Sequence, residues 1–165
     1  MFDYIEQWQN STFDASIPSE WVGLIRKYLK GKSVLDIGCG MGRFVGVFDD
    51  FDYTGLDISI PAVKFCKSKY KGEFICSDLV TFDTKKKYDN IFSWVTLEHV
   101  VPEHIKGVCN KIKRWSDNLI ITEPMGFPSG VYCFDHDYIK LLGVKPREEI
   151  NSITKIMTNE TNLLF

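Results

Sequence analysis

The stretch VLDIGCGMGRF, residues 34–44, decides the fold of this chain. Apolar residues on both sides of Asp36 run directly into three glycines at alternate positions, Gly38, Gly40 and Gly42. This pattern is typical of a buried parallel strand that breaks into a tight turn before a helix. Because glycine has no β-carbon, a cofactor can lie against the backbone of such a turn, near the amide groups that open the next helix. The stretch therefore predicts a cofactor site at the end of the first strand.

The spacing of these glycines indicates the kind of cofactor. A dinucleotide fingerprint would have its last glycine at position 43, where this chain has Arg43, and the third glycine comes one residue earlier. The resulting pattern, an acid followed by alternating glycines, resembles the first motif of the class I S-adenosylmethionine (SAM) dependent methyltransferases. The resemblance implies that Asp36 and the three glycines bind SAM, and that S-adenosylhomocysteine (SAH) is the product.

Two further acids follow predicted strands on the cofactor side. Asp57 ends the second predicted strand, where a carboxylate can accept hydrogen bonds from two ribose hydroxyls, a role that suits NAD as well as SAM. The resemblance implies that Asp78, after the third strand, bonds the adenine amino group and that Leu79 touches the ring. Ile58 joins the predicted cofactor contacts. The alternatives are that Asp57 caps the next helix and that Asp78 is a solvated turn acid.

The string YDNIFSWVTLEHV, residues 88–100, is the second specific match. It resembles the fourth-strand motif of the small-molecule methyltransferase branch, in which an L-E-H tripeptide follows the strand. Trp94 is predicted to touch the cofactor near the end of this strand. His99 lies beside the expected methyl position, where an imidazole with a pKa near neutrality can serve as a general base. The alternative is that His99 orders its own loop by hydrogen bonding.

An acceptor pocket is predicted at the same edge of the sheet, where the ends of neighbouring strands meet. Glu98, Phe127, Tyr132 and His136 are expected to line it beside His99. Aromatic residues with a few polar groups suit a small, partly apolar acceptor. His136 is a second candidate for the general base.

The Glu-His pair is also similar to RNA 3′-terminal 2′-O-methyltransferases, which bind a divalent cation through two glutamates and two histidines. Their pattern has another glutamate three residues before the pair, where this chain has Val95, and valine cannot ligate a metal. No metal is therefore expected, although a partial ligand set of Glu98, His99 and either His104 or His136 stays open.

The remaining chain alternates between predicted helices and strands. The predicted helices span residues 19–30, 42–49, 60–70, 102–115 and 135–143, and the strands after the first span residues 53–57, 73–76, 88–95, 119–122, 149–157 and 161–165. Ser59 is the predicted N-cap of helix 60–70, and Asp135 or Asp137 begins the helix that Gly143 ends. Members of the family arrange seven strands in the order 3-2-1-4-5-7-6. The resemblance therefore implies a doubly wound, mostly parallel α/β sheet with helices on both faces.

One domain is expected to account for residues 1–165, with an N-terminal helical cap at about residues 1–31. The chain has 165 residues, 44% of them hydrophobic, which is enough for one sizeable core. It has no run of about 20 apolar residues and no basic signal-peptide start, so a soluble, cytoplasmic protein is expected. Tyr4, Trp8 and Phe13 are predicted either to cover a ligand pocket or to pack outside the sheet.

Cysteine usage and charge exclude some classes of site. Five cysteines without a C-x-x-C pair disfavour a zinc site and a complete disulfide framework. A formal net charge of −2 argues against a broad nucleic-acid surface, although lysines cluster at residues 64–71 and 85–87. We therefore expect a methyltransferase acting on an O or N nucleophile of a small molecule, with a protein partner or a second copy completing the small domain. The alternatives are an inactive SAM-binding regulatory or scaffolding subunit and an RNA methyltransferase, metal-assisted if the partial ligand set binds a cation.

Overall fold

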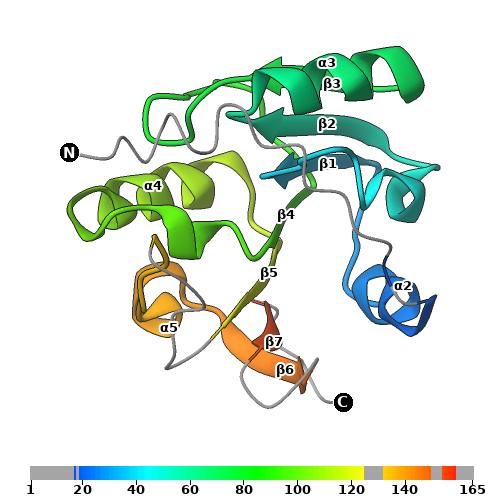
Figure 1. The fold of residues 1–165 in the computed structure, drawn as a ribbon. Coiled ribbons are helices and arrows are strands. Elements are labelled where there is room, and N and C mark those ends of the chain that lie inside the picture. Colours follow the sequence, from blue (N-terminus) through cyan, green and yellow to red (C-terminus); the bar gives the residue numbers. More distant parts are fainter. Residues whose placement is uncertain (1–16, 18, 125–131, 150–153, 159–165) are drawn as a thin grey trace.

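The computed structural model describes residue 17 and residues 19–124, 132–149 and 154–158, and it is built around one seven-stranded sheet (Figure 1). The strands are β1 Ser33–Ile37, β2 Asp52–Asp57, β3 Glu73–Cys76, β4 Asn90–Trp94, β5 Leu119–Pro124, β6 Lys145–Glu149 and β7 Thr154–Thr158. They lie in the order β3-β2-β1-β4-β5-β7-β6. β7 is antiparallel to β5 and β6, and the other pairs are parallel. The strand order that the family resemblance implied is confirmed.

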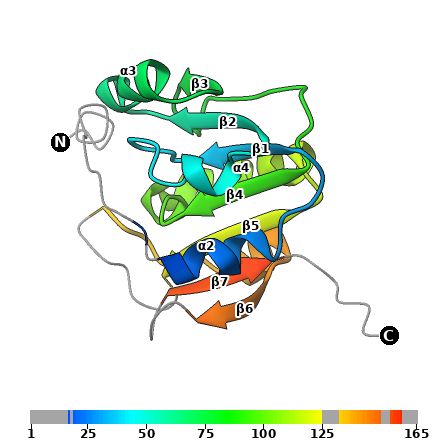
Figure 2. The same ribbon diagram turned by 90° about the vertical axis from the view of Figure 1, so that its right-hand side faces the viewer.

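Helices cover both faces of this sheet (Figure 2). The helical elements are α2 Ser19–Arg26, η1 Val45–Phe48, α3 Ile60–Lys69, η2 Leu97–His99, α4 Pro102–Trp115 and α5 Tyr138–Leu142. Leu35 and Ile91 pack with α4 and α5 in one core, whereas Val34 and Phe92 pack with α2, η1 and α3 in the other. Adjacent residues of one strand thus enter different cores, which is why the central strands are continuous apolar runs.

Local caps set several helix boundaries as predicted. The Ser59 hydroxyl accepts a hydrogen bond from the amide of Ala62 at 3.3 Å and begins α3. Asp137 accepts from the amide of Lys140 at 3.0 Å and begins α5, and Gly143 ends α5 in the left-handed conformation, with a φ of 74°. α4 has the bounds that the sequence predicted, with proline in its first turn. α5 is shorter than predicted because Asp137, rather than Asp135, is the cap.

The N-terminal helix is shorter than predicted, because α2 ends at Arg26 and not at Lys30. Beyond it, the amides of Tyr28 and Leu29 donate to carbonyls three residues back, at 3.1 and 3.3 Å, which tightens the helix end. The side-chain amide of Asn90 then accepts a hydrogen bond from the backbone N–H of Lys30 at 2.8 Å and donates one to the Lys30 carbonyl at 2.7 Å. The chain beyond α2 is thus held by a partner 60 residues away in the sequence.

The two C-terminal strands lie earlier in the chain than predicted. The expected ranges were residues 149–157 and 161–165, but β6 is Lys145–Glu149 and β7 is Thr154–Thr158. β6 begins two residues after Gly143 and forms one edge of the sheet, where a proline and several charged residues are tolerated. Its polar sequence, KPREE, therefore gives no strand signal. Residues 161–165 lie outside the described residues.

The connection between β3 and β4 contains no helix, which is unusual for two parallel strands of one sheet. The loop, residues 77–89, instead packs against α4, and the ring of Phe82 lies edge-on to Trp115 with 5.4 Å between ring centroids. Apolar side chains at Leu79 and Val80 pack against the same core. Packing against α4 therefore holds this connection in place, as the packing of a crossover helix against the sheet usually does.

Two predictions on the character of the chain can be compared with the described residues. All five cysteines are free thiols, with Cys39, Cys66 and Cys109 buried, as the sequence predicted. Within the described ranges, no helix combines the length and the apolar character needed to cross a lipid bilayer. Of the predicted N-terminal cap, α2 is described, whereas residues 1–16, including the three aromatic residues predicted to cover a pocket, lie outside the described part.

Candidate cofactor and acceptor site

The glycine turn lies at the carboxyl end of β1. Gly38, Gly40 and Gly42 all have a left-handed backbone, with φ of 74°, 51° and 81°. A β-carbon on Gly42 would come within 2.5 Å of the Tyr70 ring, so the third glycine is required by packing as well as by conformation. The amide of Gly38 donates to the Leu56 carbonyl at 2.7 Å, which folds the turn onto the end of β2. The helix predicted after the turn is reduced to the 3-10 turn η1.

Asp57 joins the glycine turn to the start of α3. One carboxylate oxygen accepts the amide of Gly40 at 2.8 Å, and the other accepts the amide of Ser59 at 2.7 Å. Burial raises the pKa of Asp57, although these backbone hydrogen bonds oppose the shift. An ionised carboxylate has about four lone-pair sites, so Asp57 keeps acceptor capacity beyond these backbone hydrogen bonds. The predicted ribose contact therefore fits this position, next to half-buried Ile58.

Asp36 lies under the glycine turn. Its side chain is 1% exposed, and Oδ2 accepts a hydrogen bond from the hydroxyl of Tyr53 at 2.6 Å. Burial raises the pKa of Asp36 to about 7. Asp36 thus supports the turn from inside the protein, and a direct contact with a cofactor stays a prediction.

Asp78 and Leu79 begin the loop after β3, beside the end of β2. The amide of Ser77 donates to the Asp57 carbonyl at 3.0 Å, which brings the two predicted cofactor acids to neighbouring positions on one edge. The carboxylate of Asp78 accepts the amide of Val80 at 2.8 Å, and its carbonyl accepts the amide of Phe82, also at 2.8 Å. Asp78 therefore caps its own turn and is half-buried, and its contact with the adenine stays a prediction.

Trp94 belongs to an aromatic cluster that the sequence did not predict. Its ring stacks on Trp21 of α2, with 4.8 Å between centroids, and lies 4.8 Å from Phe44. The guanidinium of Arg43 lies 5.8 Å from the Trp94 ring and 5.3 Å from the Phe44 ring. Arg43, the residue that excluded a dinucleotide fingerprint, thus helps to fix the indole at the end of β4.

The backbone after Trp94 is strained and is held by a buried acid. Val95 has a φ of 50°, which is a costly conformation for a β-branched residue. Glu123 of β5 is 0% exposed, and its carboxylate accepts four hydrogen bonds from this region. The donors are the Ser93 hydroxyl at 3.2 Å and the amides of Thr96 at 2.9 Å, Leu97 at 2.8 Å and Glu98 at 3.2 Å. Burial raises the pKa of Glu123 to about 7 against the effect of the amides.

The sequence did not reveal this role of Glu123, which directly follows the predicted strand 119–122. A single acid inside a buried strand, in the run LIITEP, was the available signal. Because its donors come from a turn about 25 residues earlier, sequence spacing could not identify them. The predicted strand ended at Thr122, one residue too soon to show that this acid lies inside the sheet.

The turn held by Glu123 presents Glu98 and His99 together. Glu98 is 2% exposed, and its Oε1 lies 3.8 Å from Nε2 of His99. Nδ1 of His99 lies 3.1 Å from the carbonyl oxygen of Tyr132, and the Phe134 amide donates to the Glu98 carbonyl at 2.7 Å. The predicted pocket residues Glu98 and Tyr132 therefore meet His99, while Phe127 lies outside the described residues.

His136 contacts the backbone of the turn after β4. Its Nε2 lies 2.8 Å from the Val100 carbonyl, and burial lowers its pKa. A neutral ring that donates through Nε2 holds the segment before α5 against the turn after β4. This contact gives His136 a structural role, and its roles as a pocket residue and as a second base stay predictions.

One group of three potential metal ligands occurs among the described residues. Ligand atoms of Glu98, His99 and Cys133 lie within 4.8 Å of one another. Cys133 thus replaces the third ligand considered from the sequence, because His104 is exposed on α4 and His136 bonds a backbone carbonyl.

Comparison with known proteins gives a consistent family. The family profile described as a methyltransferase domain matches residues 34–117. The chain is 28% identical over 117 residues to (S)-coclaurine N-methyltransferase of Papaver somniferum, covering 64% of this chain and 33% of that protein. It is 30% identical over 99 residues to a tRNA (carboxymethyluridine(34)-5-O)-methyltransferase of Arabidopsis thaliana, covering 59% of this chain and 23% of that protein.

The fold is also shared with solved structures. Magnesium protoporphyrin IX methyltransferase from Synechocystis PCC 6803, solved with bound SAH, superposes with a TM-score of 0.67 at 18% identity, covering 88% of this chain and 89% of that chain. Because only 18% of the aligned residues are identical, this similarity shows a shared fold alone. The chain spans only a third or less of the length of the two curated relatives named above.

Proposed function

Because the chain belongs to the methyltransferase-domain family, we propose that it is a SAM-dependent methyltransferase acting on a nitrogen or oxygen nucleophile of a small molecule. One observation supports this most strongly. The left-handed glycine turn and the carboxylates of Asp57 and Asp78 converge at the carboxyl ends of β1, β2 and β3. Ligands of open α/β sheets collect at this edge.

The residues at this edge fit SAM. The three glycines keep side chains off the turn, and the Asp57 carboxylate keeps acceptor capacity beyond its backbone hydrogen bonds. In the proposed complex Asp57 holds the ribose, Asp78 bonds the adenine amino group, and Leu79 contacts the ring. Ile58 and Trp94 complete the cofactor contacts.

The proposed chemistry requires little beyond positioning. SAM supplies an activated methyl group, so the protein has to hold the acceptor close and in line. With Nδ1 of His99 donating to the Tyr132 carbonyl, Nε2 is the nitrogen that can accept the acceptor's proton. Oε1 of Glu98 lies 3.8 Å from this nitrogen, on the acceptor side of the proposed site. The Papaver relative, named as an N-methyltransferase of (S)-coclaurine, supports a small-molecule acceptor.

The positions of Lys86 and Lys87, in one of the two lysine clusters, favour a small molecule over RNA. Lys86 lies 3.6 Å from the carboxylate of Asp52, which begins β2 at the edge opposite the glycine turn. Lys87 donates to the backbone carbonyl of Arg114 at the end of α4. These cations therefore do not line the proposed acceptor site, and the relative named as a tRNA methyltransferase remains the support for the RNA alternative.

The proposal also covers the cellular compartment and the partners of the protein. The free thiols suit a reducing compartment, and we place the protein in the cytoplasm. We also propose that a protein partner or a second copy contributes to the acceptor side. The alternative of an inactive SAM-binding subunit is disfavoured because the acids at the ends of β1, β2 and β3 are all present.

A methyl-transfer assay tests the proposed role of His99. We expect His99→Ala to lower turnover by about 10²- to 10⁴-fold, the range for loss of a general base, in assays that follow SAH release with amine and phenol acceptors. SAM affinity should stay within about threefold, below roughly 0.7 kcal/mol, because His99 is assigned to the acceptor side. His104→Ala, an exposed histidine on α4, is the matched control and should leave both quantities unchanged. Equal turnover in the two variants would remove His99 from the reaction.

A further inference from the structure

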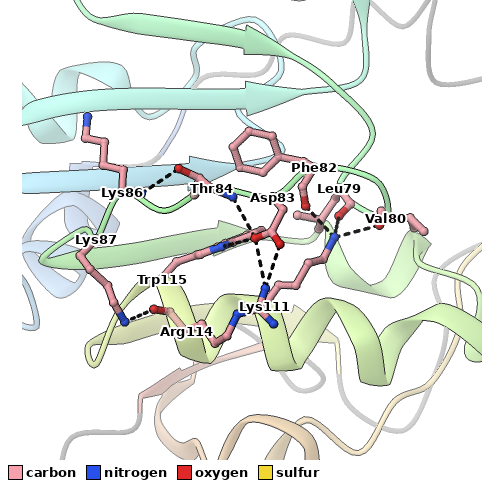
Figure 3. A network of polar contacts seen from close by, with 10 residues as sticks. All are labelled: Leu79, Val80, Phe82, Asp83, Thr84, Lys86, Lys87, Lys111, Arg114 and Trp115. Carbon is pink, nitrogen blue, oxygen red and sulfur yellow. Dashed lines mark hydrogen bonds and ion pairs between the residues drawn. The ribbon is translucent and has the colours of Figure 1, made fainter.

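Lys111 of α4 holds the loop that begins with the predicted adenine contacts (Figure 3). Its Nζ donates to the carbonyl oxygens of Leu79 at 2.9 Å, Val80 at 2.8 Å and Phe82 at 2.6 Å. An ammonium group has three N–H donors, so these three carbonyls use all of them. The loop is thus drawn onto α4 at one point, directly after Asp78.

The outer half of the loop is attached to the same helix by other contacts. The carboxylate of Asp83 accepts two hydrogen bonds from Arg114, at 3.1 and 3.0 Å, and one from the indole N–H of Trp115 at 3.1 Å. The side chains of Arg114 and Asp83 are 58% and 57% exposed, so their ion pair contributes little. Lys111 is half-buried, and its hydrogen bonds carry a full charge, which makes it the stronger attachment.

We propose that Lys111 is a positioning residue for the adenine side of the cofactor site, an inference that rests on the proposed SAM-binding function. Leu79 is both a partner of Lys111 through its carbonyl and the predicted ring contact through its side chain. Asp78 precedes it in the same turn, where the Asp78 carboxylate and carbonyl bond the amides of Val80 and Phe82. The residues that Lys111 fixes are therefore the ones that orient Asp78.

The loop needs such a residue because it has no helix of its own. A crossover helix between β3 and β4 would satisfy its backbone carbonyls internally, but residues 77–89 form none. Instead, the carbonyl oxygens of residues 79, 80 and 82 all accept hydrogen bonds from Nζ of Lys111 on α4. Removal of that side chain leaves three carbonyls without their charged donor and frees the turn.

Calorimetric titration of the full chain tests this role. The probes are SAH and the SAH analogue whose adenine amino group is replaced by a carbonyl oxygen. Lys111→Met keeps the length of the side chain and removes its donors, whereas Lys113→Met is the matched control on the same helix, since Lys113 is exposed and bonds only the Leu141 carbonyl at 2.9 Å among the described residues. We expect Lys111→Met to weaken SAH binding about tenfold and to reduce the preference for SAH over the analogue, with the control unchanged. The KM for SAM should rise while kcat at saturating SAM stays within about twofold.

The possible outcomes separate the two claims. If wild-type protein does not bind SAH, the proposed function and the role of Lys111 fail together. If wild type binds SAH and Lys111→Met binds it equally well, only the role of Lys111 is overturned. An equal loss of affinity for SAH and the analogue, or a fall in kcat alone, also contradicts positioning of the adenine contacts. Circular dichroism establishes whether each variant folds. If Lys111→Met does not fold, Lys111→Gln, which keeps two N–H donors, replaces it, and we expect the same loss of SAH affinity and preference with a smaller magnitude.

Discussion

Gly38→Ala is expected to lower the free energy of unfolding by about 2–4 kcal/mol and SAH affinity by at least about tenfold, because a single methyl group has no room in the glycine turn. The backbone there has a φ of 74°, and the new β-carbon would overlap the side chain of Thr96, with only 2.8 Å to its Cβ. Thr96 also belongs to the turn that leads to His99. Chemical denaturation and calorimetry with SAH measure the two effects.

The matched control for this prediction is Gly46→Ala, a few residues further on. A β-carbon on Gly46 meets nothing within 4 Å, and this glycine has no left-handed φ. Its substitution should leave both SAH affinity and stability nearly unchanged. If Gly38→Ala behaves like Gly46→Ala, then close packing of the glycine turn is not what the site requires.

Glu123→Ala is expected to lower the free energy of unfolding by about 3–5 kcal/mol, since it leaves several buried donors without an acceptor. The donors are three consecutive amides and the Ser93 hydroxyl, and they surround the strained backbone of Val95. Turnover should fall while SAH affinity in the folded variant stays within about threefold, because the turn carries Glu98 and His99 and not the cofactor acids. Glu103→Ala, an exposed glutamate on α4, is the control and should change neither.

Because the pKa of Glu123 is raised, its contribution to the free energy of unfolding should depend on pH. The pKa rises from 4.5 to about 7 in the folded protein, so the folded state holds the proton more tightly than the unfolded state. The contribution of this carboxyl to stability is therefore present at pH below 4.5 and is lost as the pH rises towards about 7. Glu123→Gln should flatten this part of the stability profile. An unchanged profile would mean that Glu123 is ionised throughout this range.

Most of the fold could be predicted because its signals are local. The glycine turn, the serine cap of α3 and the 14-residue amphipathic α4 each carry their information within a few residues. The early end of α2 could not be predicted, because the chain that follows it is held by Asn90 of β4, which is distant in the sequence. The predicted position of β6 was wrong for a related reason, since an edge strand needs no apolar alternation and KPREE has none.

The same distinction holds for the candidate site. Asp57 and Asp78 could be located because acids at the ends of successive parallel strands must meet at one edge. Glu123 and Lys111 could not, because each acts on backbone groups about 25 to 32 residues away in the sequence. Lysine on a helix and glutamate in a strand have no distinctive spacing of their own. Their roles are visible only when β5 and α4 are packed against the turns that they hold.

The central claim is that the glycine turn and the acid at the end of β2 form a SAM site, and calorimetric titration of wild type and Asp57→Ala with SAH tests it most directly. We expect one SAH-binding site in wild type. In Asp57→Ala the free energy of SAH binding should weaken by about 1–3 kcal/mol, because charge-assisted hydrogen bonds are lost. This corresponds to about a 5- to 150-fold weaker affinity. Absence of SAH binding to folded wild-type protein, or equal affinity in the folded Asp57→Ala variant, would contradict it.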